Sequence, residues 1–147
     1  MKRTSMSNDP CPVARSLDVI GDWWSLLIVR NALMGTRRFS EFQKQLSMAK
    51  NILAARLRTL TAHGILELGP ASDGSAYKVY VLTAKGRALF PVLVALRQWS
   101  EEFSYAPGEQ HSLLLDTKTG RPLQKIEIRA ADGRVLQPGD TTVAMPD

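Results

Sequence analysis

Apolar positions recur at a helical spacing between residues 50 and 63. Leu53, Leu57 and Leu60 fall at i, i+4 and i+7, so they share one face of a helix and should point inward. Gly64 follows this pattern, and glycine readily adopts the left-handed conformation that ends helices. The spacing therefore predicts an amphipathic helix that stops at Gly64 and leaves its opposite face to solvent.

A shorter helix is expected just before it. Ser40 to Gln43 have the sequence of a capping box, in which a serine hydroxyl and a glutamine side chain satisfy free amides at a helix start. Ser47, Met48 and Ala49 leave room only for a tight corner between the two helices. Two helices that meet at such a corner, with the second at the surface, form the helix-turn-helix arrangement that fills a DNA major groove.

The outer face of the second helix carries side chains suited to reading base pairs. Asparagine and arginine can bind adenine and guanine edges through two hydrogen bonds, and alanine lets the backbone approach the bases. An ordinary solvated face is the alternative, and spacing alone does not separate the two. The candidate DNA-binding residues on this helix are Lys50, Asn51, Ala54, Ala55, Arg56 and Arg58.

A β-hairpin is expected after Gly64. Residues 65–68 and 76–82 are rich in β-branched, aromatic and leucine residues, and residues 69–75 between them are mostly Gly, Pro, Ser and Asp. A helix-turn-helix followed by a hairpin is a winged helix. The expected fold class is therefore mainly α with a small β-hairpin wing.

Short motifs across residues 11–103 carry a family resemblance. They are Cys11-Pro12-Val13, Ile20 to Ile28, Gly35 to Phe42, Asn51-Ile52-Leu53, Arg56-Leu57, Leu60, His63 to Leu66, Leu82 to Gly86 and Trp99. In order and spacing the chain resembles the HxlR family of bacterial winged-helix transcription regulators, relatives of the MarR group. The resemblance implies a homodimer that binds double-stranded DNA at a pseudo-palindromic operator, expected to be a repressor. The alternative is a winged helix used only for protein–protein contact.

Two positions depart from the family pattern. Ala49 stands where members often carry Ser or Thr as the cap of the recognition helix, so Ser47 becomes the candidate cap. The wing tip carries Asp73 in place of a basic residue, and Lys78 is set back. The other candidate DNA-binding residues are Arg37 and Arg38, before the first helix of the motif, and Ser72, Ser75 and Lys78 in the wing.

Two helices are expected ahead of the motif. Residues 12–20, ended by Gly21, form the first. Residues 23–34, capped by Asp22, form the second, which is apolar nearly all round and so should be buried. The three tryptophans are expected in the core or in a dimer interface, where large aromatic side chains commonly pack. They are Trp23, Trp24 and Trp99.

A last helix is expected after the wing. Thr83 should cap a helix that runs to Phe103, and Pro91 should kink or restart it, because a proline ring displaces the carbonyl four residues back. In the family this helix and the first one build a two-fold dimer. The candidate dimer-interface residues are Leu89, Val92, Leu96, Trp99 and Phe103.

Residues 104–147 have a different character. Leu113 to Leu115, a turn at Thr119-Gly120, an alternating pattern from Lys125 to Arg129, and Asp132-Gly133 predict a small β-meander. We therefore expect three regions. These are a flexible N-terminus at 1–10, a DNA-binding and dimerisation domain at 11–103, and a β-rich C-terminal extension at 104–147, whose simplest role is a structural or dimer-bracing flap.

Charge and composition narrow the function. Residues 1–103 hold 14 Lys and Arg against 8 Asp and Glu, whereas residues 104–147 hold 5 against 6, so the basic surplus lies where phosphate contacts would need it. No apolar run approaches the roughly 18 residues of a membrane span, and residues 1–10 contain no signal-peptide core. A cytoplasmic protein without membrane contact is expected.

Enzymatic chemistry is not indicated by the sequence. The chain shows no phosphate-binding loop and no nucleophile elbow. One cysteine and two histidines leave neither a disulfide framework within the chain nor a zinc ligand set. We therefore expect no enzyme, no metal and no cofactor.

Cys11 is the one residue with candidate chemistry. A thiol at a helix start feels the positive end of the helix dipole, which favours the reactive thiolate, and Arg15 one turn later should add to this effect. Several HxlR-type regulators sense quinones, aldehydes or hypochlorite through a cysteine at the corresponding position. The resemblance thus implies a candidate thiol sensor for a small-molecule or oxidant effector, with a purely packing role as the alternative.

Overall fold

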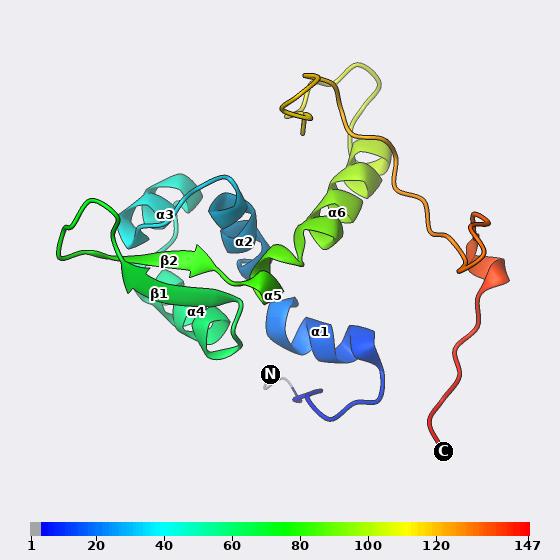
Figure 1. Cartoon of the computed structure of the whole chain (residues 1–147), viewed down its shortest axis with the longest axis horizontal. Coiled ribbons are helices and arrows are strands. Elements are labelled where there is room, and N and C mark those ends of the chain that lie inside the picture. The colour runs from blue at the N-terminus through cyan, green and yellow to red at the C-terminus, as the bar shows by residue number, and fades with distance from the viewer. Residues whose placement is uncertain (1–3) are drawn as a thin grey trace. The chain divides into compact units, whose positions relative to one another are not determined.

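The computed structural model describes residues 4–147 and contains two compact units (Figure 1). The first unit ends at Pro91, and the second runs from Val92 to Asp147. The helices are α1 (Pro12–Ile20), α2 (Ser25–Leu33), α3 (Phe39–Leu46), α4 (Lys50–Ala62), α5 (Ala84–Arg87) and α6 (Phe90–Phe103). The strands are β1 (Leu66–Pro70) and β2 (Lys78–Leu82), and η1 (Pro138–Asp140) is a short 3-10 turn.

The core of the first unit lies against the inward face of α4. Leu53, Leu57 and Leu60 are completely buried, which confirms the orientation that the spacing predicted. Phe42 on α3 and Ile28 on α2 are buried as completely. Helix α4 packs against α3 and β1, and α3 packs against α2. Because burial of one such side chain stabilises the fold by roughly 1.5–3 kcal/mol, this stripe fixes α4 to the body of the unit.

The β-hairpin is confirmed, and it is anchored on both sides. Strands β1 and β2 pair antiparallel, with Leu66 opposite Leu82. On the other edge of β2, the backbone N–H of Tyr80 donates to the carbonyl oxygen of Arg37 at 2.8 Å. The segment just before α3 therefore lies beside β2, and the hairpin is tied to the helix-turn-helix as well as to itself. A hairpin that follows a helix-turn-helix in the chain and is bonded to it in this way is the wing of a winged helix.

Two predicted helix caps are wrong. Helix α3 begins at Phe39, and the backbone N–H of Arg38 donates to the Glu41 carboxylate at 3.1 Å, so Ser40 lies within the helix instead of capping it. Ser47 does not cap α4. It ends α3 in the left-handed conformation, with φ of 52°, and α4 starts after Ala49 without a side-chain cap. At α3 the Glu41 carboxylate satisfies the Arg38 N–H, and Ser47 belongs to the end of α3 and not to the start of α4.

Asp22 caps α2 as expected, but the helix is shorter and less buried than predicted. The Asp22 carboxylate accepts hydrogen bonds from the backbone N–H groups of Trp24 at 3.0 Å and Ser25 at 2.9 Å. The two ends of the predicted helix are exposed, Trp23 by 83% and Met34 by 70%. Within α2 the buried residues are Ser25, Ile28, Val29 and Asn31, so an apolar composition did not mean burial on all sides.

The last predicted helix is divided in two. The Thr83 hydroxyl caps α5 by accepting a hydrogen bond from the Gly86 N–H at 3.1 Å. Helix α5 ends at Arg87, and α6 begins at Phe90 with Pro91 in its first turn. A proline fits the first turn of a helix because the N–H that it lacks would have no partner there. Pro91 thus restarts the helix, the second of the two predicted outcomes.

The predicted β-meander is not formed. Among the described residues 104–147 there is no strand, and only two isolated bridges join Leu115 to Pro122 and Arg129 to Val135. The predicted turns exist, with Gly120 and Gly133 at φ of 69° and 93°. No residue of this segment is buried. Without a buried face, nothing selects one strand register over another, so alternation in the sequence did not produce a sheet.

The described part of the N-terminal segment is hydrogen-bonded to α1. The Met6 N–H and the Ser5 hydroxyl donate to the Asp18 carboxylate at 3.0 and 3.2 Å. Residues 1–3, which belong to the predicted flexible N-terminus, lie outside the described residues. Between residues 4 and 10 the chain therefore follows a path that Asp18 helps to fix.

Gly86 provides a test of how α5 meets the hairpin. A Cβ atom at this position would lie 2.2 Å from the Ile65 carbonyl oxygen and 2.8 Å from a methyl carbon of Leu82. We expect Gly86→Ala to lower the free energy of unfolding by about 1–3 kcal/mol through overpacking. Urea denaturation followed by circular dichroism measures this loss. Gly69→Ala is the control, because that position has open space around it, and an equal loss in both variants would contradict the contact.

Candidate nucleic-acid interface

The burial of the leucine stripe leaves the opposite face of α4 accessible. Lys50, Asn51 and Arg58 are exposed, and Ala54 and Ala55 are half-buried beside them. These are the positions at which the sequence places base and backbone contacts. The face is thus available to a large ligand, with two side chains that can form paired hydrogen bonds to base edges and two small residues between them.

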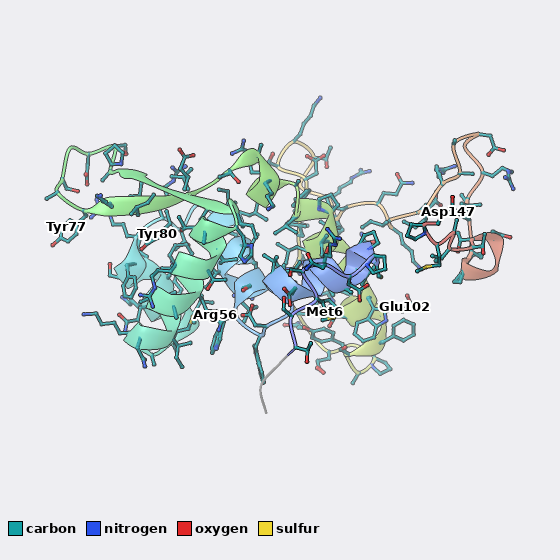
Figure 2. The ribbon with its side chains drawn as sticks, turned by 90° about the horizontal axis from the view of Figure 1, so that it is seen from below. Met6, Arg56, Tyr77, Tyr80, Glu102 and Asp147 are labelled. Atoms are coloured by element: carbon teal, nitrogen blue, oxygen red, sulfur yellow. The ribbon has the colours of Figure 1, made fainter. Side chains whose placement is uncertain are left out.

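Arg56 differs from its neighbours on α4. Its Nη1 atom lies 3.6 Å from Oδ1 of Asp22, the residue that caps α2, and both side chains are partly buried. Figure 2 shows Arg56 on α4. The charge of Arg56 is therefore partly balanced within the protein, and its guanidinium links α4 to the start of α2. Sequence reasoning counted Arg56 as a DNA contact and missed this link.

A polar cluster with two buried members holds α2 and α3 together. The side chain of Gln45 on α3 accepts hydrogen bonds from Asn31 Nδ2 at 3.0 Å and from the Thr36 hydroxyl at 2.8 Å. Asn31 and Thr36 are only 3% and 7% exposed. Buried polar groups must be hydrogen-bonded, so these bonds restrict how α3 can lie on α2. The sequence signal for this cluster was Asn31, a polar residue inside an apolar helix.

Arg38 is held by the wing. Its guanidinium forms an ion pair with the carboxylate of Asp73 and lies 5.6 Å from the centre of the Tyr77 ring. Tyr77 is labelled at the loop end of the hairpin in Figure 2. The backbone N–H of Ser75, donating at 3.0 Å, and the nearby Arg38 lower the pKa of Asp73, so its carboxylate is charged at neutral pH. The acidic residue at the wing tip is thus paired with an arginine expected to contact phosphate.

The other predicted DNA contacts lie on the same unit. Arg37 is exposed just before α3, Lys78 is exposed at the start of β2, and Ser72 is exposed in the hairpin loop. Ser75 is half-buried. The structure therefore places the candidate residues on three neighbouring parts of the first unit: the outer face of α4, the segment before α3, and the wing.

Cys11 is exposed at the start of α1, directly before Pro12. Its backbone N–H donates to the Asp9 carboxylate at 2.8 Å. The side chain of Arg15, which the sequence suggested as support for the thiolate, donates through Nε to the Asp9 carbonyl oxygen at 2.6 Å. The thiol is therefore accessible to a reagent.

Helix α6 carries an uncovered apolar stripe. The four predicted interface residues on this helix are between 40% and 67% exposed, and the ring centres of Trp99 and Phe103 lie 6.0 Å apart. Leu89, the fifth, is half-buried ahead of α6. We call the four exposed residues, Val92, Leu96, Trp99 and Phe103, the α6 stripe. An apolar patch of this kind marks a surface that normally binds another protein surface.

No group of three or more His, Cys, Asp or Glu side chains in residues 4–147 could hold a metal ion. None of the helices in these residues is both long enough and apolar enough to span a bilayer.

A recognition helix held by a buried stripe, a second helix packed behind it and an anchored hairpin define a winged helix-turn-helix. The chain matches the HxlR-like helix-turn-helix family over residues 19–107 and belongs to that family. Rv3095 of Mycobacterium tuberculosis, named as an uncharacterised HTH-type transcriptional regulator, is 38% identical over 95 residues, which are 65% of this chain and 60% of that protein. YodB of Bacillus subtilis, an HTH-type transcriptional regulator, is 31% identical over 71% of this chain and 94% of its own. The chain thus spans less than two thirds of the mycobacterial relative.

The matches to solved structures differ in how much of the chain they cover. PA1607, named as a proposed transcription factor, is 55% identical and matches 96% of this chain and 99% of its own with a TM-score of 0.91. The reduced form of YodB is 30% identical and matches 67% of this chain and 98% of its own with a TM-score of 0.57. The redox regulator HypR in its reduced form is 33% identical over 63% of this chain and 92% of its own, with a TM-score of 0.55. The match to PA1607 therefore covers nearly the whole chain, whereas the matches to YodB and HypR cover about two thirds of it.

The pairing of Arg38 with Asp73 predicts a gain of affinity in one variant. Asp73→Asn keeps an acceptor for the Ser75 N–H but removes the charge that holds Arg38. We expect tighter binding to duplex DNA of any sequence, and a plot of log affinity against log salt that is steeper by about one phosphate contact. Fluorescence anisotropy across a salt series measures both.

The control for this prediction is Glu109→Gln, which removes one negative charge from the second unit. Equal slopes in the two variants would show that net charge alone, and not the release of Arg38, caused the change.

Proposed function

We propose that this protein is a DNA-binding transcription regulator that acts as a homodimer on a pseudo-palindromic operator and represses transcription. The observation that carries this proposal is the accessible face of α4, which presents Asn51 and Arg58 opposite a fully buried leucine stripe. Membership of a helix-turn-helix family whose relatives are named transcriptional regulators supports it. Such a protein acts in the cytoplasm by occupying DNA, and no catalytic step is needed.

The proposed binding mode follows from the positions of the side chains. Helix α4 enters the major groove, where Asn51 and Arg58 read base edges and the alanines allow close approach. Arg37 and Lys50 contact phosphates, and Lys78 and Ser72 reach the backbone from the wing. The basic surplus of residues 1–103 supplies the salt-dependent part of the affinity. The base contacts of Asn51 and Arg58 supply the sequence preference.

The proposed dimer uses the α6 stripe. Two-fold symmetry forms each contact between the chains twice, so one stripe per chain that the partner covers is sufficient to close a dimer. Two-fold symmetry then places the two recognition helices on half-sites about one helical turn apart, roughly 34 Å. Sizing of the free protein and footprinting of the bound DNA test this geometry. A monomer that protects a single site would contradict it.

The recognition face is tested by Asn51→Ala and Arg58→Ala. If each side chain forms a paired contact with a base, each variant loses about 1–3 kcal/mol of binding to the operator and relaxes preference at one base pair. Anisotropy titrations with the operator and with a scrambled duplex measure the two effects. Lys118→Ala, in the extension, is the charge-matched control for Arg58→Ala. Unchanged operator binding in both α4 variants would reject the assigned face, and no binding to any duplex would favour a module for protein contact.

Cys11 is proposed as a thiol sensor that modulates this binding. Its exposure meets the first condition for reactivity, and HypR, a relative in fold, is named a redox regulator. The chain has one cysteine, so oxidation joins Cys11 to a second chain or to a small thiol. A modification at the start of α1 would act by shifting the two recognition helices relative to each other, which changes their match to the half-sites.

The sensor is tested with Cys11→Ser. We expect this variant to bind the operator as the wild type does and to keep that affinity after treatment with diamide or a quinone, while the treated wild type loses affinity. Mass spectrometry establishes how much of the wild-type thiol is modified. Full operator affinity in quantitatively modified wild type would show that Cys11 is structural.

A further inference from the structure

The extension is attached to α6 by polar contacts over its first half. Gln98 donates through Nε2 to the Gln124 carbonyl oxygen at 3.1 Å, and its Oε1 accepts a hydrogen bond from the Ile126 N–H at 2.8 Å. Arg97 donates to the Ser112 carbonyl oxygen at 2.9 Å. These bonds hold residues up to Ile126 on α6 within the second unit.

After Ile126 these attachments stop. Among the described residues, every hydrogen bond and ion pair of residues 127–147 is made within that segment, such as those from Ala130 N–H to the Arg134 carbonyl and from Leu136 N–H to the Ile128 carbonyl, both 2.8 Å. We call residues 127–147 the arm. It has a defined internal turn, yet in Figure 1 it continues past α6 as an open chain to the C-terminus.

The arm displays apolar side chains to solvent. Ile128, Val135, Val143 and Met145 are 44–83% exposed, and no residue of the arm is buried. Ordering a backbone costs about 1–2 kcal/mol per residue, and here no burial within the chain offsets that cost. A segment with this pattern is stabilised only when another surface covers its apolar side chains.

The α6 stripe is the surface that fits. It lies on the same unit and is itself uncovered, so the chain's own arm does not occupy it. The arm carries four acidic residues against two arginines, which disfavours a nucleic acid as its ligand. Arm and stripe together hold eight exposed large apolar side chains, an area on the order of the 800 Å² per partner that a stable protein interface buries.

We infer that the arm of each chain packs on the α6 stripe of a second copy, so that the two chains exchange arms around the dimer axis. Arm and stripe belong to one chain, so two-fold symmetry forms the contact twice and closes the assembly. The inference rests on the homodimer proposed above but not on DNA binding. It assigns a role to residues 127–147, which lie beyond the part of the chain, residues 19–107, that matches the family.

Mixed dimers test the exchange directly. One chain carries Cys11→Ser and Val143→Cys with a nitroxide spin label at position 143, and the other carries Cys11→Ser and is labelled with ¹⁵N. The spin-labelled chain is in large excess, so that most ¹⁵N chains are in mixed dimers. We then expect the Trp99 indole N–H signal of the ¹⁵N chain to lose more than half of its intensity relative to the sample with reduced nitroxide. The Trp23 and Trp24 signals serve as the comparison. The inference is overturned if Trp99 is broadened only when label and ¹⁵N are on the same chain, or if sedimentation shows a monomer.

A second measurement uses substitutions that cannot disturb a buried core. Ile128→Asp places a charge in the proposed contact, whereas Thr142→Asp adds the same charge at an exposed polar position of the arm. Sedimentation equilibrium should show a dimer dissociation constant at least ten times higher for Ile128→Asp, with little change for Thr142→Asp and equal helix content in both. Equal dissociation constants would overturn the inference, whatever either variant does on DNA.

Discussion

Complete burial of three leucines on α4 is the constraint on which the first unit depends. Together Leu53, Leu57 and Leu60 contribute a stabilisation of the same order as the whole stability of a typical domain, about 5–15 kcal/mol. A helix that buries one stripe so fully cannot rotate about its axis without exposing it. The opposite face is therefore fixed as well, so the hydrophobic core sets the orientation of the side chains on the outer face of α4.

Burial alone does not orient the parts, because it is not directional. A few polar contacts supply direction. Gln45 receives two hydrogen bonds from Asn31 and Thr36 and restricts α3 on α2, while Asp22 both caps α2 and approaches Arg56 of α4. None of these contacts joins the site to a ligand. They help to determine which charged side chains remain free to contact a ligand. An arginine that pairs with a carboxylate of the protein, as Arg56 does with Asp22, is less available to a ligand.

Sequence predicted those features that depend on spacing within one element. The inward face of α4, the stop at Gly64 and the hairpin were all readable because periodicity and turn residues act locally. Features that need a distant partner were not readable. Asp73 lies 35 residues from Arg38, and no local pattern indicates their pairing. The predicted meander failed for a related reason: alternation at residues 125–129 specifies a strand only if a buried face exists to receive it. The predicted cap at Ser40 is wrong because the helix starts earlier, where the Glu41 carboxylate accepts a hydrogen bond from the Arg38 N–H.

The hydrogen bond between Tyr80 and Arg37 has a wider consequence. It makes β2 a neighbour of the segment that leads into α3, so the wing and the helix-turn-helix move as one body. The distance between the element that would enter a major groove and the loop that would lie over the adjacent groove is then set by the protein. A duplex must supply the matching groove width or deform to reach it, at a cost that depends on its base steps. Two sequences with identical contacted bases would thus differ in affinity because one is stiffer than the other.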